Sequence, residues 1–190
     1  MSAITAEVAV APAPAFVDPA SDFSDGLQVL RVYHEDFLVQ GRRLLTLAQA
    51  IHQHGLDEDR SAEAAQLAEY YRQTTRCHHQ DEERALFPLI VNRSFLIDGM
   101  IERLALDHDE IEELWGELCG WLQTTDGPPA RHLELVPRFE KILRTHIERE
   151  DTDFFPVIAD LLSHEQRREL GATMARLRRR EPSLNGAVCE

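Results

Sequence analysis

The sequence predicts an all-α protein, an antiparallel up-down-up-down four-helix bundle followed by a short extra C-terminal helix. In four segments of roughly 25–30 residues, apolar residues recur at alternating steps of three and four, the spacing of a helix seam. Short polar breaks separate these segments, so consecutive helices should run antiparallel. No segment shows the period-two alternation of a strand, which excludes a sheet.

The first helix is expected from residue 24 to the polar break HQHGLDEDRS. Gly55 in that break is a typical helix stop, and Ser61 is a candidate N-cap for the second helix, expected over 61–91. The first seam steps regularly through Leu27, Leu30, His34, Phe37, Gly41, Leu44, Ala48 and Ile51.

The third helix is expected over about 96–123 and the fourth over about 131–162, joined by the loop DGPPA. Pro88 and Pro156 lack a backbone donor, so each should kink its helix. Ser163 and Gln166 match a capping box that starts the fifth helix, about 164–180. The basic run at 176–181 is expected at the end of that helix, where the helix dipole favours cations.

Three parts are predicted along the chain. Residues 1–22, rich in alanine and proline and without lysine or arginine, are expected to be a flexible tail. The alternative is a short packed arm through Val8, Val10 and Phe16. The bundle should occupy 23–162, and 163–190 should hold the short helix and a disordered C-terminal tail.

Composition excludes several classes of function. The 34 acidic and 20 basic residues give a formal charge of -14, which opposes binding to nucleic acid or to an anionic membrane surface. No run of about 18 apolar residues predicts a membrane span. The 3 cysteines form no CxxC pair, so neither a disulfide framework nor a zinc-thiolate site is predicted. Free thiols favour a cytoplasmic location.

Histidine is the unusual component, with 9 residues, and each seam carries one near its middle: His34, His78, His108 and His146. Because seams face the interior, these four imidazoles should converge. Two seams also carry a carboxylate one turn later, Glu82 and Glu150, and residues i and i+4 project from the same face of a helix. The flanking sequences HHQDEERALFP and HIEREDTDFFP resemble each other, which suggests two pseudo-symmetric halves.

Burying two carboxylates and four imidazoles together requires a compensating positive charge. Six donors exceed the four that a tetrahedral zinc ion takes, so a pair of ions bridged by the carboxylates fits better. Mixed nitrogen and oxygen donors favour two iron ions, with manganese-iron or two zinc ions as alternatives.

Each of these residues could also have an ordinary structural role. A lone histidine on a seam is usually a hydrogen-bonded core residue, and the chain could be an acidic helical bundle that holds no metal and binds a partner protein. The joint pattern of four seams favours the metal. A ferritin-like site is disfavoured, because that architecture uses Glu-x-x-His rather than His-x-x-x-Glu. His79 is offset by about 100° from His78 and is expected at a helix interface or outside.

These residues and motifs resemble the hemerythrin-like, or HHE cation-binding, family. The resemblance covers about residues 24–162 and is carried by His34, the block HHQDEERALFP, Asp107 with His108, and the block HIEREDTDFFP. It implies a four-helix bundle around a non-haem di-iron centre. By that resemblance, the terminal ligands would be His34, His78, His108 and His146. The bridges would be Glu82, Glu150 and a solvent-derived oxo or hydroxo group.

The chain also departs from the oxygen-carrying members of that family. Those members have a fifth histidine on the third helix, whereas Leu104 and Glu112 occupy the positions four residues from His108. Glu112, Asp151 and Tyr71 are therefore possible additional ligands. A glutamate four residues after the last histidine resembles the sensing and iron-sulfur repair branches. Residues 1–22 lack the cysteine of the N-terminal domain that the repair proteins carry.

An open position on the iron pair is expected to bind O₂, NO or peroxide. The first hypothesis is a module that binds or senses O₂ or NO. The second is an enzyme that consumes peroxide or O₂, or an iron donor for cluster repair. Outer carboxylates that orient the ligands are expected among Glu35, Glu83, Asp109 and Asp151. The pocket wall is expected to consist of apolar seam residues: Leu30, Phe37, Leu104, Ile111, Trp115 and Ile142.

Overall fold

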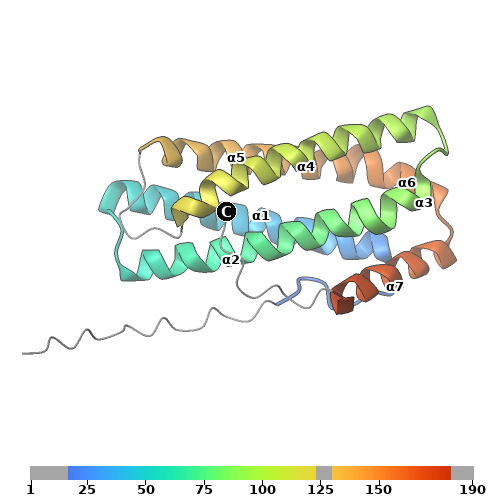
Figure 1. Cartoon of the computed structure of the whole chain (residues 1–190), viewed down its shortest axis with the longest axis horizontal. Coiled ribbons are helices and arrows are strands. Elements are labelled where there is room, and N and C mark those ends of the chain that lie inside the picture. The colour runs from blue at the N-terminus through green and yellow to red at the C-terminus, as the bar shows by residue number, and fades with distance from the viewer. Residues whose placement is uncertain (1–16, 123–129, 181–190) are drawn as a thin grey trace, which may run out of the picture.

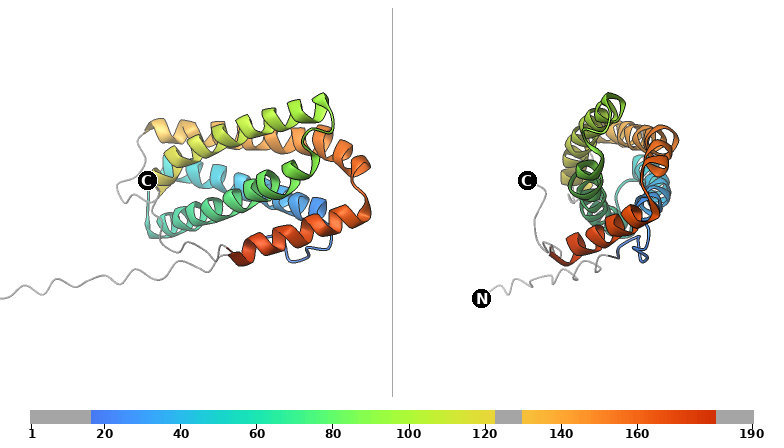
Figure 2. Two further views of the ribbon diagram at one scale, coloured as in Figure 1. Left: turned by 45° about the vertical axis from the view of Figure 1, so that its right-hand side comes forward. Right: turned by 90° about the vertical axis from the view of Figure 1, so that its right-hand side faces the viewer.

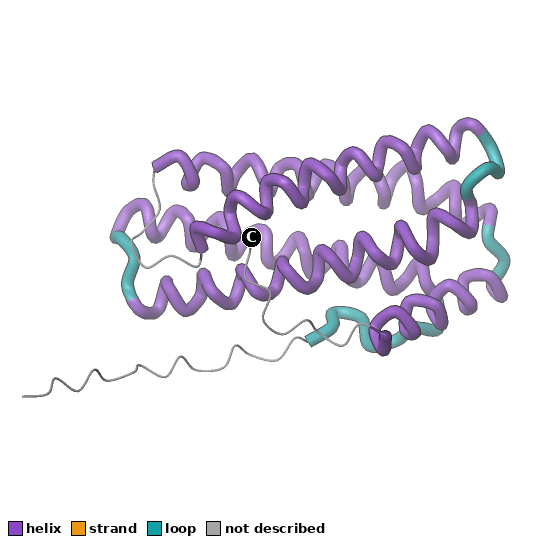
Figure 3. Tube along the Cα trace, in the orientation of Figure 1, coloured by secondary structure: helices purple, strands orange, loops and turns teal. Residues whose placement is uncertain are grey.

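The computed structural model describes residues 17–122 and 130–180, and all the regular structure in that part of the chain is helical (Figure 3). Four long helices form the bundle: α1 (Gly26–His54), α2 (Glu58–Asp81), α4 (Phe95–Leu122) and α5 (Ala130–Arg149). Each packs on its neighbour in sequence, and α5 closes the ring against α1 (Figures 1 and 2). The prediction of a helical bundle is confirmed.

The ends of α1 and the start of α2 follow from local chemistry. The Asp25 carboxylate caps α1 by accepting from the Leu27 N–H, and Gly55 ends the helix at φ 78°, a conformation that favours glycine. Asp57 caps α2 by accepting from the Arg60 N–H at 2.9 Å. The prediction of Ser61 as the N-cap is wrong, because Asp57 supplies a charged acceptor one turn earlier.

Two π-helical turns interrupt the bundle at matching places. Helix α2 passes into η1 (Glu82–Leu86) and then α3 (Phe87–Ile90), and α5 passes into η2 (Glu150–Phe154) and then α6 (Phe155–Leu161). In both, the phenylalanine N–H donates to the carbonyl of the glutamate five residues earlier. Each proline then lies in the first turn of the next helix, where no N–H is needed. The expected kinks are thus π-turns that begin at the two glutamates.

Helix α7 (His164–Arg180) runs across α1 and α2 on the outside of the bundle (Figure 1). The capping box at its start is confirmed, since Ser163 and Gln166 each accept the other's backbone N–H. The basic run lies at the end of α7 as expected, and its Arg178 also forms a part-buried ion pair with Asp81.

The ordered packing begins earlier in the chain than expected, at residues that precede α1. Asp18 accepts from the Tyr33 hydroxyl at 2.7 Å and pairs with Arg178, and Ala20 is buried. Asp18 and Ala20, placed in the flexible tail, therefore pack against the folded unit. The proposed arm through Val8, Val10 and Phe16 and the expected C-terminal tail at 181–190 lie outside the described residues. No described helix is long and apolar enough to cross a membrane.

Candidate metal centre

Four buried imidazoles meet in the middle of the bundle, one from each long helix. None of the four residues is more than 2% exposed. They form two pairs. The Nε2 atoms of His34 on α1 and His78 on α2 lie 3.1 Å apart. The ring centroids of His108 on α4 and His146 on α5 lie 4.9 Å apart.

The two glutamates that begin the π-turns lie between these pairs, and each reaches both. Glu150 Oε2 is 3.0 Å from His34 Nε2 and 3.1 Å from His146 Nε2. Glu82 Oε2 is 3.1 Å from His108 Nε2 and 3.7 Å from His78 Nε2. Both glutamates are 0% exposed. Each carboxylate therefore lies where it could link an ion held by one pair to an ion held by the other.

Outer carboxylates orient two of the rings. Asp151 lies 3.0 Å from His34 Nδ1, and Glu83 lies 2.9 Å from His108 Nδ1. Because an ionised carboxylate only accepts, each Nδ1–H donates to it, and each Nε2 is the ring nitrogen that faces the interior. Glu35 and Asp109, also expected in this role, are exposed.

The carboxylate nearest the outward nitrogen of His146 is that of Asp107 on α4, which the sequence analysis did not expect in this role. Asp107 Oδ2 lies 3.6 Å from His146 Nδ1, wider than a hydrogen bond. Arg103 and Arg149 both pair with the Asp107 carboxylate, which is buried. The arginines therefore neutralise Asp107 and leave the His146 ring without a close outer partner.

Aromatic rings wall the two halves in the same way. The Phe155 ring stacks on His34 at a centroid distance of 5.4 Å, and the Phe87 ring stacks on His108 at 6.1 Å. Both phenylalanines directly follow a π-turn. The sequence repeat thus corresponds to a structural repeat, in which each half supplies an imidazole, a carboxylate and a phenylalanine that shields the other half's imidazole from water.

Burial and the neighbouring carboxylates have opposite effects on the pKa values of the buried histidines. Burial lowers the pKa of His34, but the neighbouring carboxylates of Asp151 and Glu150 outweigh it and raise the pKa to about 9. His108 behaves alike, since Glu82 and Glu83 raise its pKa to about 9 against burial. Burial and the neighbouring Glu150 raise the pKa of Glu82. Without metal, this interior holds protons that bound cations would displace.

Among the residues that the structure describes, many donor atoms of this interior lack hydrogen-bond partners in the protein and are free to bind metal ions. Both carboxylate oxygens of Glu82 and Glu150 and the Nε2 atoms of His108 and His146 are buried without a hydrogen-bond partner. Unpartnered buried polar atoms are rare in folded proteins, and these face a common centre. His78, Glu82, His146 and Glu150 each offer an atom within 4.8 Å of the others, so they can hold an ion. The structure brings together all six residues that the sequence analysis selected.

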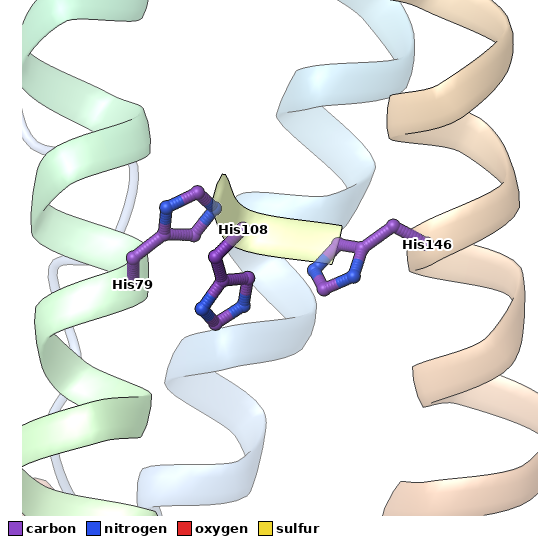
Figure 4. A group of neighbouring side chains, drawn as sticks. All are labelled: His79, His108 and His146. Atoms are coloured by element: carbon purple, nitrogen blue, oxygen red, sulfur yellow. The ribbon is translucent and has the colours of Figure 1, made fainter. Parts of the chain in front are cut away.

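His79 is a seventh donor that the sequence analysis placed at a helix interface or outside. It is 2% exposed, and its ring stacks on His108 at a centroid distance of 3.9 Å. Its Nδ1 lies 2.9 Å from Glu112 Oε1. His79, His108 and His146 form a second group able to hold an ion (Figure 4). The only signal in the sequence was the doubled histidine before Glu82.

The three possible additional ligands lie away from the centre. Asp151 contacts the outward nitrogen of His34, and the 61% exposed side chain of Glu112 contacts His79. The buried Tyr71 hydroxyl lies near Gly41, among aromatic rings. Among the described histidines, cysteines and acidic residues, neither Asp151 nor Glu112 belongs to a group able to hold an ion.

Five of the six expected pocket residues are buried: Leu30, Phe37, Leu104, Ile111 and Trp115. Ile142 is only partly buried, because the phase of α5 points its neighbour Leu143 inward instead. Phe37 contacts His78 edge-on at a centroid distance of 5.4 Å. The apolar wall on that side therefore reaches the imidazoles directly.

Fold and site together define a helical protein with buried histidine and glutamate groups able to hold metal cations. The chain matches the model of the hemerythrin HHE cation-binding domain over residues 25–158, and it belongs to that family. It is also 23% identical over 155 residues to an uncharacterized protein of Haemophilus influenzae, covering 80% of this chain and 90% of that protein. No solved structure matches the chain significantly.

Proposed function

We propose that the protein holds two iron ions bridged by Glu82 and Glu150 and binds or senses O₂ or NO there. The observation that carries this proposal is that each carboxylate contacts one imidazole of each pair. The Oε2–Nε2 distances are 3.0–3.1 Å for Glu150 and 3.1–3.7 Å for Glu82. A single ion would need only one of the pairs.

Iron suits this donor set best, because carboxylates favour harder cations and imidazoles favour iron, zinc, copper or nickel. Zinc and manganese are the substitutes to measure against it. His34 and His108 would bind through Nε2 while Asp151 and Glu83 hold their Nδ1 protons. When bound, a reduced iron pair supplies the electrons that O₂ or NO binding draws on.

The surrounding residues favour a small neutral ligand. Phe37, Phe87 and Phe155 pack against the imidazoles, and each is at most 7% exposed. Such a wall excludes bulk water and adds no charge that would hold an ionic substrate. We therefore infer a diatomic ligand rather than an organic one. The formal charge of -14 separately opposes a role in binding nucleic acid or an anionic membrane.

A metal analysis with optical spectra tests the proposal. Two irons per chain are expected, with an absorption band that dithionite bleaches and that O₂ or NO alters reversibly without turnover. Glu150→Gln should lose the band, and Glu148→Gln, at an exposed position two residues earlier, should keep it. A chain that takes up no iron, zinc or manganese would refute the proposal.

A second candidate is an enzyme that reduces peroxide or O₂, or a protein that releases iron for iron-sulfur cluster repair. The exposure of the outer carboxylates favours it, since the side chains of Asp151 and Glu83 are 39% and 48% exposed while hydrogen-bonded to buried imidazoles. Such contacts offer protons a route from solvent, which turnover needs and reversible binding does not. Steady peroxide consumption by the iron-loaded protein would select this candidate.

A further inference from the structure

We infer that His79 is a metal ligand, and that with His108 and His146 it makes the ion position beside α4 and α5 a three-nitrogen site. This inference rests on the proposed metal centre and adds a donor to it. The two ion positions then differ, because the pair His34 and His78 supplies only two nitrogens to the other position.

The protonation of His79 is fixed from outside the bundle. Its Nδ1 lies 2.9 Å from Glu112 Oε1, and a carboxylate can only accept, so Nδ1 carries the proton. The opposite nitrogen, Nε2, therefore presents a lone pair. Glu83 orients His108 in the same way, through its Nδ1. A carboxylate that holds the outer nitrogen of a histidine is the usual companion of a metal-binding imidazole.

The free lone pair of His79 faces the interior, and the part of the chain that the structure describes offers it no partner. The residue is 2% exposed, and Nε2 is buried without a hydrogen bond. Figure 4 shows His79 on α2 turned toward His108 and His146. A purely structural histidine would use both nitrogens or expose one, and stacking on His108 occupies only the ring face.

The spacing of the nitrogens indicates what binding must change. One ring nitrogen from each of the three histidines lies within 4.8 Å of the others. Metal–nitrogen bonds of about 2.1 Å place neighbouring ligand nitrogens about 3.0–3.4 Å apart. Because imidazole lone pairs lie in the ring planes, the His79 ring must turn out of its 12° parallel alignment with His108 before both can bind one ion. Loss of this stacking is a consequence specific to ligation.

The extra nitrogen gives the two positions different preferences. Imidazole-rich sites favour zinc, copper, nickel and iron over manganese. The position with His79 should bind zinc more tightly than the position with His34 and His78, so zinc should fill the two positions in two steps.

A zinc titration of the full chain against a competing chelator tests the inference. Wild type should bind two zinc ions in two resolved steps. His79→Leu should weaken the tighter step by more than about tenfold, because loss of even an outer partner costs about 10–100-fold in affinity. The weaker step should not change. His54→Leu, on an exposed position at the end of α1, is the matched control and should bind as wild type does.

The outcomes separate this inference from the proposed function. If wild type binds no metal, the proposed centre itself fails. If wild type binds two ions and folded His79→Leu binds them with unchanged affinities, only the role of His79 is overturned. Should His79→Leu fail to fold by circular dichroism, pulsed EPR on wild type with one equivalent of Cu²⁺ decides. Three coordinated imidazoles support the inference, and two overturn it.

Discussion

The ion pair that fastens α7 to the bundle allows a quantitative prediction. Arg178 donates to both carboxylate oxygens of Asp81, at 3.0 and 2.5 Å, and its side chain is 16% exposed while that of Asp81 is 0% exposed. The Nε of Arg178 also donates to Asp18, and its Nη2 also donates to the Tyr33 hydroxyl. Arg178→Met removes the cation, keeps much of the stem, and leaves Asp81 buried without its counter-ion.

The magnitude follows from the burial of the pair. Breaking a buried ion pair from one side costs about 3–5 kcal/mol, because the remaining charge is uncompensated. A chain of this size loses about 2–4 °C of melting temperature per kcal/mol. Arg178→Met should therefore lower the melting temperature at pH 7.5 by about 6–20 °C. Arg179→Met, on an exposed neighbour, should change it little.

The penalty should also depend on pH. Burial raises the pKa of Asp81 to about 6 even though Arg178 lowers it, from an ordinary value of 3.8. A carboxyl whose pKa is higher in the folded state favours folding while protonated, and this contribution is lost as pH rises through 6. At pH 5 Asp81 is mostly protonated and the ion pair is largely absent already. The effect of Arg178→Met should thus be smaller at pH 5 than at pH 7.5.

Thermal melts of the metal-free protein, followed by circular dichroism at both pH values, measure this difference. Removing both charges in Asp81→Asn with Arg178→Met should recover most of the stability lost at pH 7.5, since no charge then remains buried alone. An equal penalty at both pH values, or no recovery in the double variant, would refute the reasoning.

Three further predictions concern the metal, the docking of α7 and an outer carboxylate. Chelation should lower the melting temperature by about 10–20 °C, because two ions at a hundred times their dissociation constants contribute about 5 kcal/mol, and a return to the original value on adding iron checks it. Gly171→Ala should cost about 1–3 kcal/mol by urea unfolding, since its Cβ would overlap the Phe23 carbonyl oxygen. The control for Gly171→Ala is Gly116→Ala, which has open space around it in α4 and should stabilise by about 0.5–1 kcal/mol. Glu83→Gln weakens the acceptor at His108 Nδ1 and should reduce iron affinity by about 10–100-fold in a chelator competition.

The sequence predicted the helices and the convergence of the six donors because both depend on one periodicity. A residue on a helix seam must face the interior, and four seams of similar length bring their middle residues to one level. His34 and Glu150, from opposite ends of the bundle sequence, come within 3.0 Å for that reason.

The errors arose where two neighbouring residues fit the pattern equally well. Ile142 and Leu143 both fall three or four residues from Phe139 and His146, so only the packed phase of α5 distinguishes them. His79 lies one residue from its seam and is buried where α4 packs on α2, the helix interface that was one of its two expected places, but it was not counted as a donor. Such positions depend on the neighbouring helix, which a single seam does not specify.

The π-turns were anticipated only as disturbances. Pro88 and Pro156 predicted a break in helix geometry beyond each glutamate, but no local pattern specifies a bond to the residue five positions earlier. The part played by α7 was also missed, because Arg178 belongs to a basic run that is usually solvated.

Anomalous diffraction from crystals of the metal-loaded protein tests the central claim most directly. Two peaks are expected inside the bundle, one beside His34 and His78 and one beside His108 and His146, each within bonding distance of a glutamate oxygen. Peaks confined to the surface, or an interior without any peak in fully loaded protein, would contradict the claim.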